Sequence, residues 1–181
     1  MLFVISGPTG SGKDTVINEL LKNFPNSYKV PSTVTRARRP GEEGYRYISQ
    51  EEFKQKIQND EFVEYVQVFG TDYYGTLKTD IENAIDCKEP VFRILDVVGY
   101  QKIKELGIKC IGIFLCVLDK EELARRIYLR GESQEDIKRR IARVDYEIQM
   151  SKNYDHVIDG KSLLENVATC IKIVEEYLDK V

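Results

Sequence analysis

Short apolar runs alternate along most of the chain with segments whose apolar residues recur at helical spacing. Buried strands are predicted at residues 2–6, 91–96 and 111–118, with a weaker strand at 155–158. Helices are predicted at residues 13–23, near 100–106, and at 120–130, 134–152 and 162–179. Because strands alternate with helices in this order, the pattern predicts an α/β fold with a parallel sheet and helices on both of its faces.

Residues 32–76 interrupt this alternation. A basic loop at 36–44 precedes two segments of alternating polar and apolar residues, at 45–49 and 61–70, and a polar helix is expected between them near 51–59. Many aromatic residues and few long helices indicate a small, mainly antiparallel insert. We interpret this insert as a substrate-binding subdomain.

A single domain is therefore expected, in which an α/β core carries two additions. The chain of 181 residues, with 42% hydrophobic and 31% charged residues, is ordinary for one globular domain. The core is predicted at about residues 1–31, 77–119 and 153–181, and the insert at about 32–76. The segment at about 120–152 contains two basic helices joined by the turn RGESQ, which is typical of a mobile lid.

The basic residues are concentrated in two groups. The chain has 27 basic and 30 acidic residues, a net charge of −3, which argues against a general nucleic-acid-binding protein. The two groups consist of Arg36, Arg38 and Arg39, and of Arg125, Arg126, Arg130, Lys138, Arg139, Arg140 and Arg143. Local positive charge on a slightly acidic protein indicates a small, highly charged anion as the partner. The second group has an alternative interpretation as a solvated helix face, whose charges pair locally with Glu132, Glu135 and Asp136.

Other function classes find little support in the sequence. The four cysteines are scattered without a CxxC pair, which is typical of reduced, buried thiols in a cytosolic protein. The single histidine, His156, has no partner at the spacing of zinc ligands. The apolar run at the N-terminus is too short for a signal peptide or a membrane span, so a cytoplasmic protein without a membrane partner is expected.

The strongest local motif is a glycine-rich loop between the first predicted strand and the first predicted helix. It reads Gly7, Pro8, Thr9, Gly10, Ser11, Gly12, Lys13. Glycines allow successive backbone N–H groups to point toward phosphate oxygens, and the following helix adds its positive N-terminal end. The motif predicts an ATP site in which Lys13 supplies a full charge to the β- and γ-phosphates.

The residue after this lysine departs from the usual motif. A serine or threonine normally stands there and its hydroxyl holds Mg²⁺, whereas this chain has Asp14 followed by Thr15. A carboxylate is a good ligand for magnesium, so Asp14 is a candidate metal ligand. The alternative is that Asp14 pairs with Lys13.

The insert carries candidate groups for a phosphorylated acceptor. Residues 32–41 combine hydroxyl groups with arginines, whose planar fork binds a phosphate through two hydrogen bonds. Glu64 follows an apolar pair further along the insert. One carboxylate can accept both the N1–H and the N2–H donors of guanine, whereas adenine has no such pair of donors. Glu64 is therefore predicted to recognise a guanine base, with nearby tyrosines in contact with the ring.

The motifs taken together resemble the guanylate kinase family. The segments GPTGSGK, STVTRARRPGE, EFVEYVQVFGTDYYGT, ILDVVG and LARRIYLRG…IKRRI occur in the family's order and extend over nearly the whole chain. The resemblance implies a P-loop NTPase fold with a GMP-binding insert and a helical lid. It also implies the reaction of ATP with GMP, or dGMP, to give ADP and the diphosphate, with Mg²⁺ as cofactor.

The resemblance assigns roles to individual residues by matching position. The phosphate of GMP is assigned to Ser32, Arg36, Arg39, Tyr45 and Tyr74. Guanine recognition is assigned to Glu64 and Thr76, and a place near the acceptor and the metal to Asp96. Arg126 and Arg130 match arginines of the lid, and Arg140 matches a phosphate-facing arginine of the next helix. With Lys13 and Arg36, these three arginines form the predicted catalytic set.

The chain also departs from the family's usual pattern at several positions. The loop between Glu42 and Tyr45 is shorter, and Asp72 matches no residue of the family's usual sequence. Ile94 stands where the family has an aspartate, which leaves Asp96 as the remaining carboxylate of that strand. The family's late Asn-Asp-Asp turn on the adenine side is reduced to an aspartate and a glycine at 159–160.

Two alternatives to a guanylate kinase remain open from the sequence. One is a kinase of the same fold that acts on another phosphorylated acceptor such as ribose 1,5-bisphosphate, because its loop shares the sequence GKD. The other is a guanylate-kinase-like domain that binds protein ligands without catalysis, although Lys13 and the loop glycines are retained here. The sequence leaves the oligomeric state open between a monomer and a homodimer.

Overall fold

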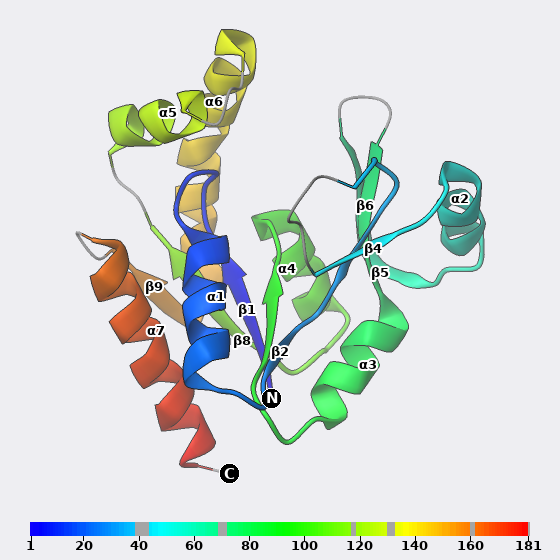
Figure 1. Cartoon of the computed structure of the whole chain (residues 1–181), viewed down its shortest axis with the longest axis horizontal. Helices are drawn as coiled ribbons and strands as arrows, with labels where there is room; N and C mark the ends of the chain where they lie inside the picture. The colour runs from blue at the N-terminus through cyan, green and yellow to red at the C-terminus, as the bar shows by residue number, and fades with distance from the viewer. Residues whose placement is uncertain (39–43, 69–71, 117–118, 130–132, 160–161, 181) are drawn as a thin grey trace.

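A parallel sheet of five strands forms the centre of the protein (Figure 1). The computed structural model describes residues 1–38, 44–68, 72–116, 119–129, 133–159 and 162–180. In spatial order the strands are β2 (Tyr28–Lys29), β7 (Val91–Ile94), β1 (Leu2–Ser6), β8 (Ile111–Leu115) and β9 (His156–Ile158). Every pair of neighbours is parallel, so all carboxyl ends meet at one edge of the sheet. Ligand sites of open α/β sheets lie outside this edge.

Helices cover both faces of this sheet because its central strands are apolar on both sides. Phe3 and Ile5 of β1 pack in a core with α1 (Lys13–Asn23) and α7 (Leu163–Leu178). Leu2 and Val4 point to the opposite face, where their core includes residues of α3 (Lys78–Asp86) and α4 (Val97–Glu105). All five residues of β1 are buried, as expected of a parallel strand covered on both faces. The predicted α/β fold class is confirmed.

Strands between residues 32 and 77 form a second sheet of four strands. Its order is β4 (Tyr45–Tyr47), β3 (Ser32–Val34), β6 (Asp72–Leu77) and β5 (Phe62–Val68). The pairs β3–β6 and β5–β6 are antiparallel and β3–β4 is parallel, so this sheet is mainly antiparallel but mixed. Helix α2 (Gln50–Gln58) covers it through Phe53, whose ring stacks on Phe62 and Tyr73.

Two helices differ from the sequence prediction. Helix α3 (Lys78–Asp86) follows β6 directly and was not foreseen. Helix α4 begins at Val97 rather than near Tyr100. Its start is fixed by Asp96, whose side chain accepts a hydrogen bond from the Gly99 N–H at 2.8 Å.

The predicted lid segment contains α5 (Lys120–Tyr128) and α6 (Gln134–Met150), followed by the short 3₁₀ helix η1 (Ser151–Asn153). Asp119 caps α5 by accepting hydrogen bonds from the backbone N–H groups of Glu121 and Glu122. In Figure 1, α5 and the upper part of α6 lie above the loop between β1 and α1, and the second sheet lies to the right of this loop. None of the helices in the described residues is long and apolar enough to cross a membrane.

Candidate active site

The loop between β1 and α1 has a backbone that only glycine adopts readily. Gly7, Gly10 and Gly12 have φ angles of 144°, 90° and 89°. A Cβ atom on Gly7 would lie 2.4 Å from the carbonyl oxygen of Leu115 at the end of β8, which rules out any side chain there. Gly12 is the N-cap residue of α1, and no side chain there accepts hydrogen bonds from the first N–H groups of the helix. The geometry is that of an anion site at a helix N-terminus.

Lys13 and Ser11 add polar groups to this loop. Lys13 Nζ donates hydrogen bonds to the carbonyl oxygens of Gly7 at 2.7 Å and Pro8 at 2.9 Å, so its charge is held over the loop. Ser11 is 2% exposed, and its hydroxyl has no hydrogen-bond partner within the described part of the chain. A buried polar group without a partner is unfavourable unless a ligand or water satisfies it.

Two arginines of the lid segment contact the same loop. Arg126 of α5 donates to the carbonyl oxygen of Gly10 at 3.0 Å, and Arg140 of α6 donates to the Thr9 hydroxyl at 3.1 Å. Arg126 also binds Glu122, which in turn binds Arg125. The hydrogen bonds from Arg125 and Arg126 lower the pKa of Glu122 to about 2. The second basic group is therefore not uniform. Arg125 pairs locally on an exposed face, whereas Arg126 and Arg140 contact the glycine-rich loop at residues 7–13, which we call the phosphate loop.

A further cluster at the end of β7 was missed in the sequence. Arg143 of α6 forms ion pairs with Asp96 at 2.8 Å and with Glu147 at 3.2 Å. The Glu147 side chain is only 13% exposed, and this burial raises its pKa, against the attraction of Arg143 and Lys13. Arg143 and Glu147 are four residues apart on one helix, a spacing that could have indicated the pair. This cluster connects α6 to the carboxylate predicted to lie near the acceptor.

Arg36 is enclosed by tyrosines of the second sheet. Its guanidinium carbon lies 4.9 Å from the ring centre of Tyr45, 5.8 Å from that of Tyr47 and 5.9 Å from that of Tyr74. Its Nε donates to the Tyr74 hydroxyl at 2.9 Å. Cation–π contacts of this kind hold the guanidinium in place without neutralising its charge. The structure thus brings three of the residues assigned to the acceptor phosphate together.

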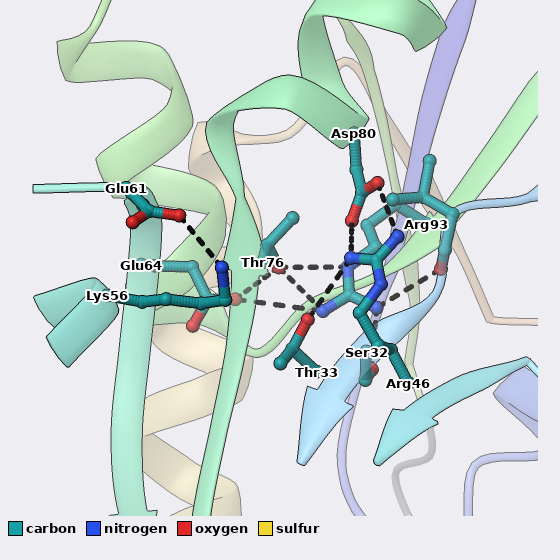
Figure 2. A network of polar contacts seen from close by, with 10 residues as sticks. Ser32, Thr33, Arg46, Lys56, Glu61, Glu64, Thr76, Asp80 and Arg93 are labelled. Atoms are coloured by element: carbon teal, nitrogen blue, oxygen red, sulfur yellow. Dashed lines mark hydrogen bonds and ion pairs between the residues drawn. The ribbon is translucent and has the colours of Figure 1, made fainter. Parts of the chain in front are cut away.

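Glu64 and Thr76 are neighbours across β5 and β6, and a buried arginine joins them (Figure 2). The Thr76 hydroxyl donates to Glu64 Oε1 at 2.5 Å. Arg93 of β7 donates to Thr76 and also to the Ser32 hydroxyl at 2.6 Å. Burial raises the pKa of Glu64, while Arg93 and Thr76 oppose that rise. Arg93 was missed in the sequence, although a single arginine inside the apolar run VFRIL was a visible signal.

The two candidate metal ligands are both paired with cations. Asp14 lies 3.0 Å from Lys29 Nζ of β2, and its side chain is 72% exposed. Asp96 caps α4 and binds Arg143. Within the described residues no three acidic, histidine or cysteine side chains are grouped so that they could hold a metal ion. One or two carboxylates suit an Mg²⁺ ion that binds together with a nucleotide and takes its other ligands from phosphate and water.

Several sequence predictions fall outside the described residues. Arg39 of the acceptor set and Arg130 of the lid set belong to this group, as do Gly160 and the acidic residue Glu132. Thr15, which follows Asp14, is exposed on the first turn of α1.

The chain is similar to guanylate kinases over nearly its full length. The family model described as guanylate kinase matches residues 1–180. The chain is 35% identical to a guanylate kinase of Porphyromonas gingivalis, with 98% of this chain and 95% of the relative covered. It is 37% identical to a guanylate kinase of Prochlorococcus marinus, with 96% of each covered. Among solved structures, guanylate kinase from Anaplasma phagocytophilum matches with a TM-score of 0.76 and 28% identity, over 98% of this chain and 86% of that one.

Proposed function

The chain belongs to the guanylate kinase family, and from this premise we propose that it transfers the γ-phosphate of ATP to GMP or dGMP, giving ADP and the corresponding diphosphate. Members of this family are ATP-dependent nucleoside monophosphate kinases. The observation that carries the proposal is the presence of two separate cationic sites, at Lys13 and at Arg36, together with one largely buried carboxylate, Glu64, that is suited to guanine.

The donor site is the loop between β1 and α1. ATP phosphates would lie against the N-terminal end of α1, where Lys13 exchanges its two carbonyl contacts for phosphate oxygens. The buried Ser11 hydroxyl would gain a partner in the same step. The residues proposed to form this site are Gly7, Pro8, Thr9, Gly10, Ser11, Gly12, Lys13, Asp14 and Thr15.

The acceptor site is the concentration of polar groups on the second sheet. Arg36 would bind the GMP phosphate together with Tyr74, because both already share a hydrogen bond and present their polar ends together. Glu64 would accept the two adjacent N–H donors of guanine. The residues proposed to form this site are Ser32, Arg36, Arg39, Tyr45, Glu64, Tyr74, Thr76 and Asp96.

Transfer of the phosphoryl group requires alignment and charge neutralisation more than covalent chemistry. Arg126 and Arg140 already contact the phosphate loop, so a small movement of α5 and α6 would place them on the transferring group, together with Arg130. Such closure also excludes water, which would otherwise consume ATP.

Magnesium fits this site as a partner of the nucleotide. Asp96 and Asp14 supply carboxylate oxygens of the kind Mg²⁺ prefers, at one or two positions rather than as a complete cage. When bound, the ion would offset the negative charge of the phosphates. Arg143 would then lose its contact with Asp96 while keeping the one with Glu147, and Lys29 would lose its contact with Asp14.

A coupled assay of ADP release tests the proposal, with GMP, dGMP, AMP, UMP, CMP and ribose 1,5-bisphosphate as acceptors. We expect stimulation by GMP and dGMP. Stimulation only by the sugar bisphosphate would identify a different kinase of this fold, and ATP binding without turnover would indicate a binding domain. The relatives described above are guanylate kinases, so neither alternative is favoured. We place the activity in cytoplasmic purine nucleotide metabolism.

A further inference from the structure

Arg93 is a buried guanidinium that extends from the main sheet into the second sheet. It lies on β7 between Phe92 and Ile94 and is 3% exposed. Figure 2 shows its side chain among residues of β3, β5 and β6, with contacts from all three of its nitrogens. An arginine at this depth is retained only where its hydrogen bonds are satisfied, because an unpaired buried charge is very unfavourable.

The partners of Arg93 are largely the residues assigned to GMP. Nη1 donates to the Ser32 hydroxyl at 2.6 Å and to the Val30 carbonyl oxygen at 3.3 Å. Nε and Nη2 donate to the Thr76 hydroxyl at 3.1 and 2.6 Å. Nη2 also lies 3.7 Å from Glu64 Oε1. A residue that only joined the two sheets would not need to contact Ser32, Thr76 and Glu64 in particular.

The hydrogen bonds fix the direction of the Thr76 hydroxyl. Its oxygen accepts from two nitrogens of Arg93, so its single proton is directed to Glu64 Oε1. Among the described residues, the hydrogen bond and the ion pair to the Glu64 carboxylate are both made to Oε1. The carboxylate is therefore held through Oε1, and neither of these two contacts uses Oε2.

We propose that Arg93 is a positioning residue for acceptor recognition, which orients Glu64 through Thr76 so that the carboxylate meets the N1–H and N2–H edge of a guanine base. The proposal rests on the proposed function, since it takes a guanine monophosphate as the acceptor. It adds a residue of the core to Glu64 and Thr76, the guanine-recognising pair that the insert supplies.

Charge supports the same role. Burial raises the pKa of Glu64, and Asp96 at the start of α4 raises it further, whereas Arg93 and the Thr76 hydroxyl lower it. Helix α4 packs close to the Glu64 side chain, because a Cβ atom on Gly99 would lie 3.4 Å from Glu64 Cγ. Arg93 is the cation that opposes this rise in pKa and so favours the ionised form, which offers both of its oxygens as acceptors to guanine.

The test is steady-state kinetics of the full chain with ATP and either GMP or inosine monophosphate, which lacks the 2-amino group. In Arg93→Met we expect KM for GMP to rise by about tenfold or more, the size of one charge-assisted hydrogen bond. KM for ATP should stay near its wild-type value, and the preference for GMP over inosine monophosphate should shrink. Arg93→Lys keeps the charge without the planar fork and should restore part of the preference.

Arg46→Met is the matched control. Arg46 of β4 forms two hydrogen bonds with Asp80 of α3, at 2.6 and 2.9 Å, and so also connects the second sheet to the rest of the chain. Its loss should lower the melting temperature without changing the ratio of the two KM values. An equal change of that ratio in both variants would show that Arg93 acts only by holding the sheets together.

The remaining outcomes also decide the question. An unchanged preference for GMP in a folded Arg93→Met protein would overturn the proposal. If Arg93→Met does not fold, Thr76→Val provides the test, because it removes the hydroxyl that connects Arg93 to Glu64. We expect this variant to prefer GMP over inosine monophosphate less strongly. A Thr76→Val protein with the wild-type preference would overturn the proposal. Absence of GMP turnover in the wild type would refute the proposed function itself, whereas wild-type turnover with unaltered variants refutes only the role of Arg93.

Discussion

Arg36 Nε donates a hydrogen bond to the Tyr74 hydroxyl at 2.9 Å, and the two residues are 38 positions apart in the sequence. The bond connects the segment after β3 to β6. Because the rings of Tyr45 and Tyr47 also lie beside this guanidinium, its position is set before any acceptor arrives. A preorganised cation loses less conformational entropy when it binds a phosphate.

Replacement of Arg36 tests the acceptor site. In Arg36→Ala we expect KM for GMP to rise on the order of 100-fold, because charge-assisted hydrogen bonds to a phosphate contribute about 1.5–3 kcal/mol. The dissociation constant of ATP, measured by calorimetry, should change little. Arg38→Ala is the control, since Arg38 lies 6.0 Å from the Tyr47 ring centre, at the edge of this cluster. Equal losses of ATP and GMP affinity in Arg36→Ala would contradict the assignment.

Replacement of Lys13 tests the donor site. Lys13→Met should reduce the rate of phosphoryl transfer by about 100-fold or more, because the charge over the phosphate loop is lost. The measurement is the single-turnover rate at saturating ATP and GMP, with circular dichroism to verify folding. Lys29→Met removes a lysine that binds Asp14 outside the loop and should have a much smaller effect. Comparable losses in both variants would argue against a direct role of Lys13.

The arginines of α5 and α6 should affect the rate more than the binding of either substrate. We expect Arg140→Ala to lower kcat by about 10- to 100-fold with little change in KM for GMP, because Arg140 contacts the phosphate loop through Thr9. Lys138→Ala removes a charge from an exposed position of the same helix and serves as the control. A normal kcat in Arg140→Ala, measured with both substrates saturating, would remove this residue from the mechanism.

Recognition of guanine should depend on pH through Glu64. Burial raises the pKa of this carboxyl above that of an ordinary glutamate. The ionised form is the one that accepts both guanine donors, so KM for GMP should rise as the pH falls through this raised pKa. The measurement is KM for GMP between about pH 5 and 8 at saturating ATP. Glu64→Gln should show a high KM without this dependence, and an identical pH profile in both proteins would exclude Glu64 as its source.

Substitution of Gly112 tests the packing of β8 against Tyr100 of α4. A Cβ atom there would lie 2.3 Å from the Tyr100 hydroxyl oxygen, and the Tyr100 ring is buried and stacked on Tyr154 at 4.0 Å between centres. Gly112→Ala should therefore lower the free energy of unfolding by about 1–3 kcal/mol, measured by chemical denaturation. The loss of unfolding free energy should be smaller in a Tyr100→Leu background. An equal loss in both backgrounds would show that the clash with Tyr100 is not its cause.

The sequence predicted those parts of the fold that have continuous or periodic apolar residues. The runs at β1, β7 and β8 were recognised because a strand buried on both faces is apolar throughout. Strand β2 was missed because its two residues, Tyr28 and Lys29, are too few to show a pattern. Helix α3 was missed because it is short and mostly polar, with only Ile81, Ala84 and Ile85 as apolar residues. It is stabilised by the contacts of Ile81 and Ala84 with the core.

The candidate site was predictable where a motif is local and not where side chains meet over long distances. The phosphate loop is a continuous segment, so its seven residues could be identified together. The partners of Arg93, and the ion pair between Arg143 and Asp96, come from separate elements that only the folded chain brings together. No spacing along the sequence encodes such contacts.

The position of Arg93 on β7 has a consequence for protein engineering. A chimera that received residues 32–76 from this chain would acquire the carboxylate and the hydroxyl of the proposed guanine site, but not Arg93, which belongs to β7 of the core. If this segment were grafted onto a kinase that has an apolar residue at the position of Arg93, Glu64 would no longer be held in place. We expect such a chimera to discriminate poorly among purines. The unit that would have to be transferred is therefore discontinuous in sequence and consists of the second sheet together with Arg93 of the first.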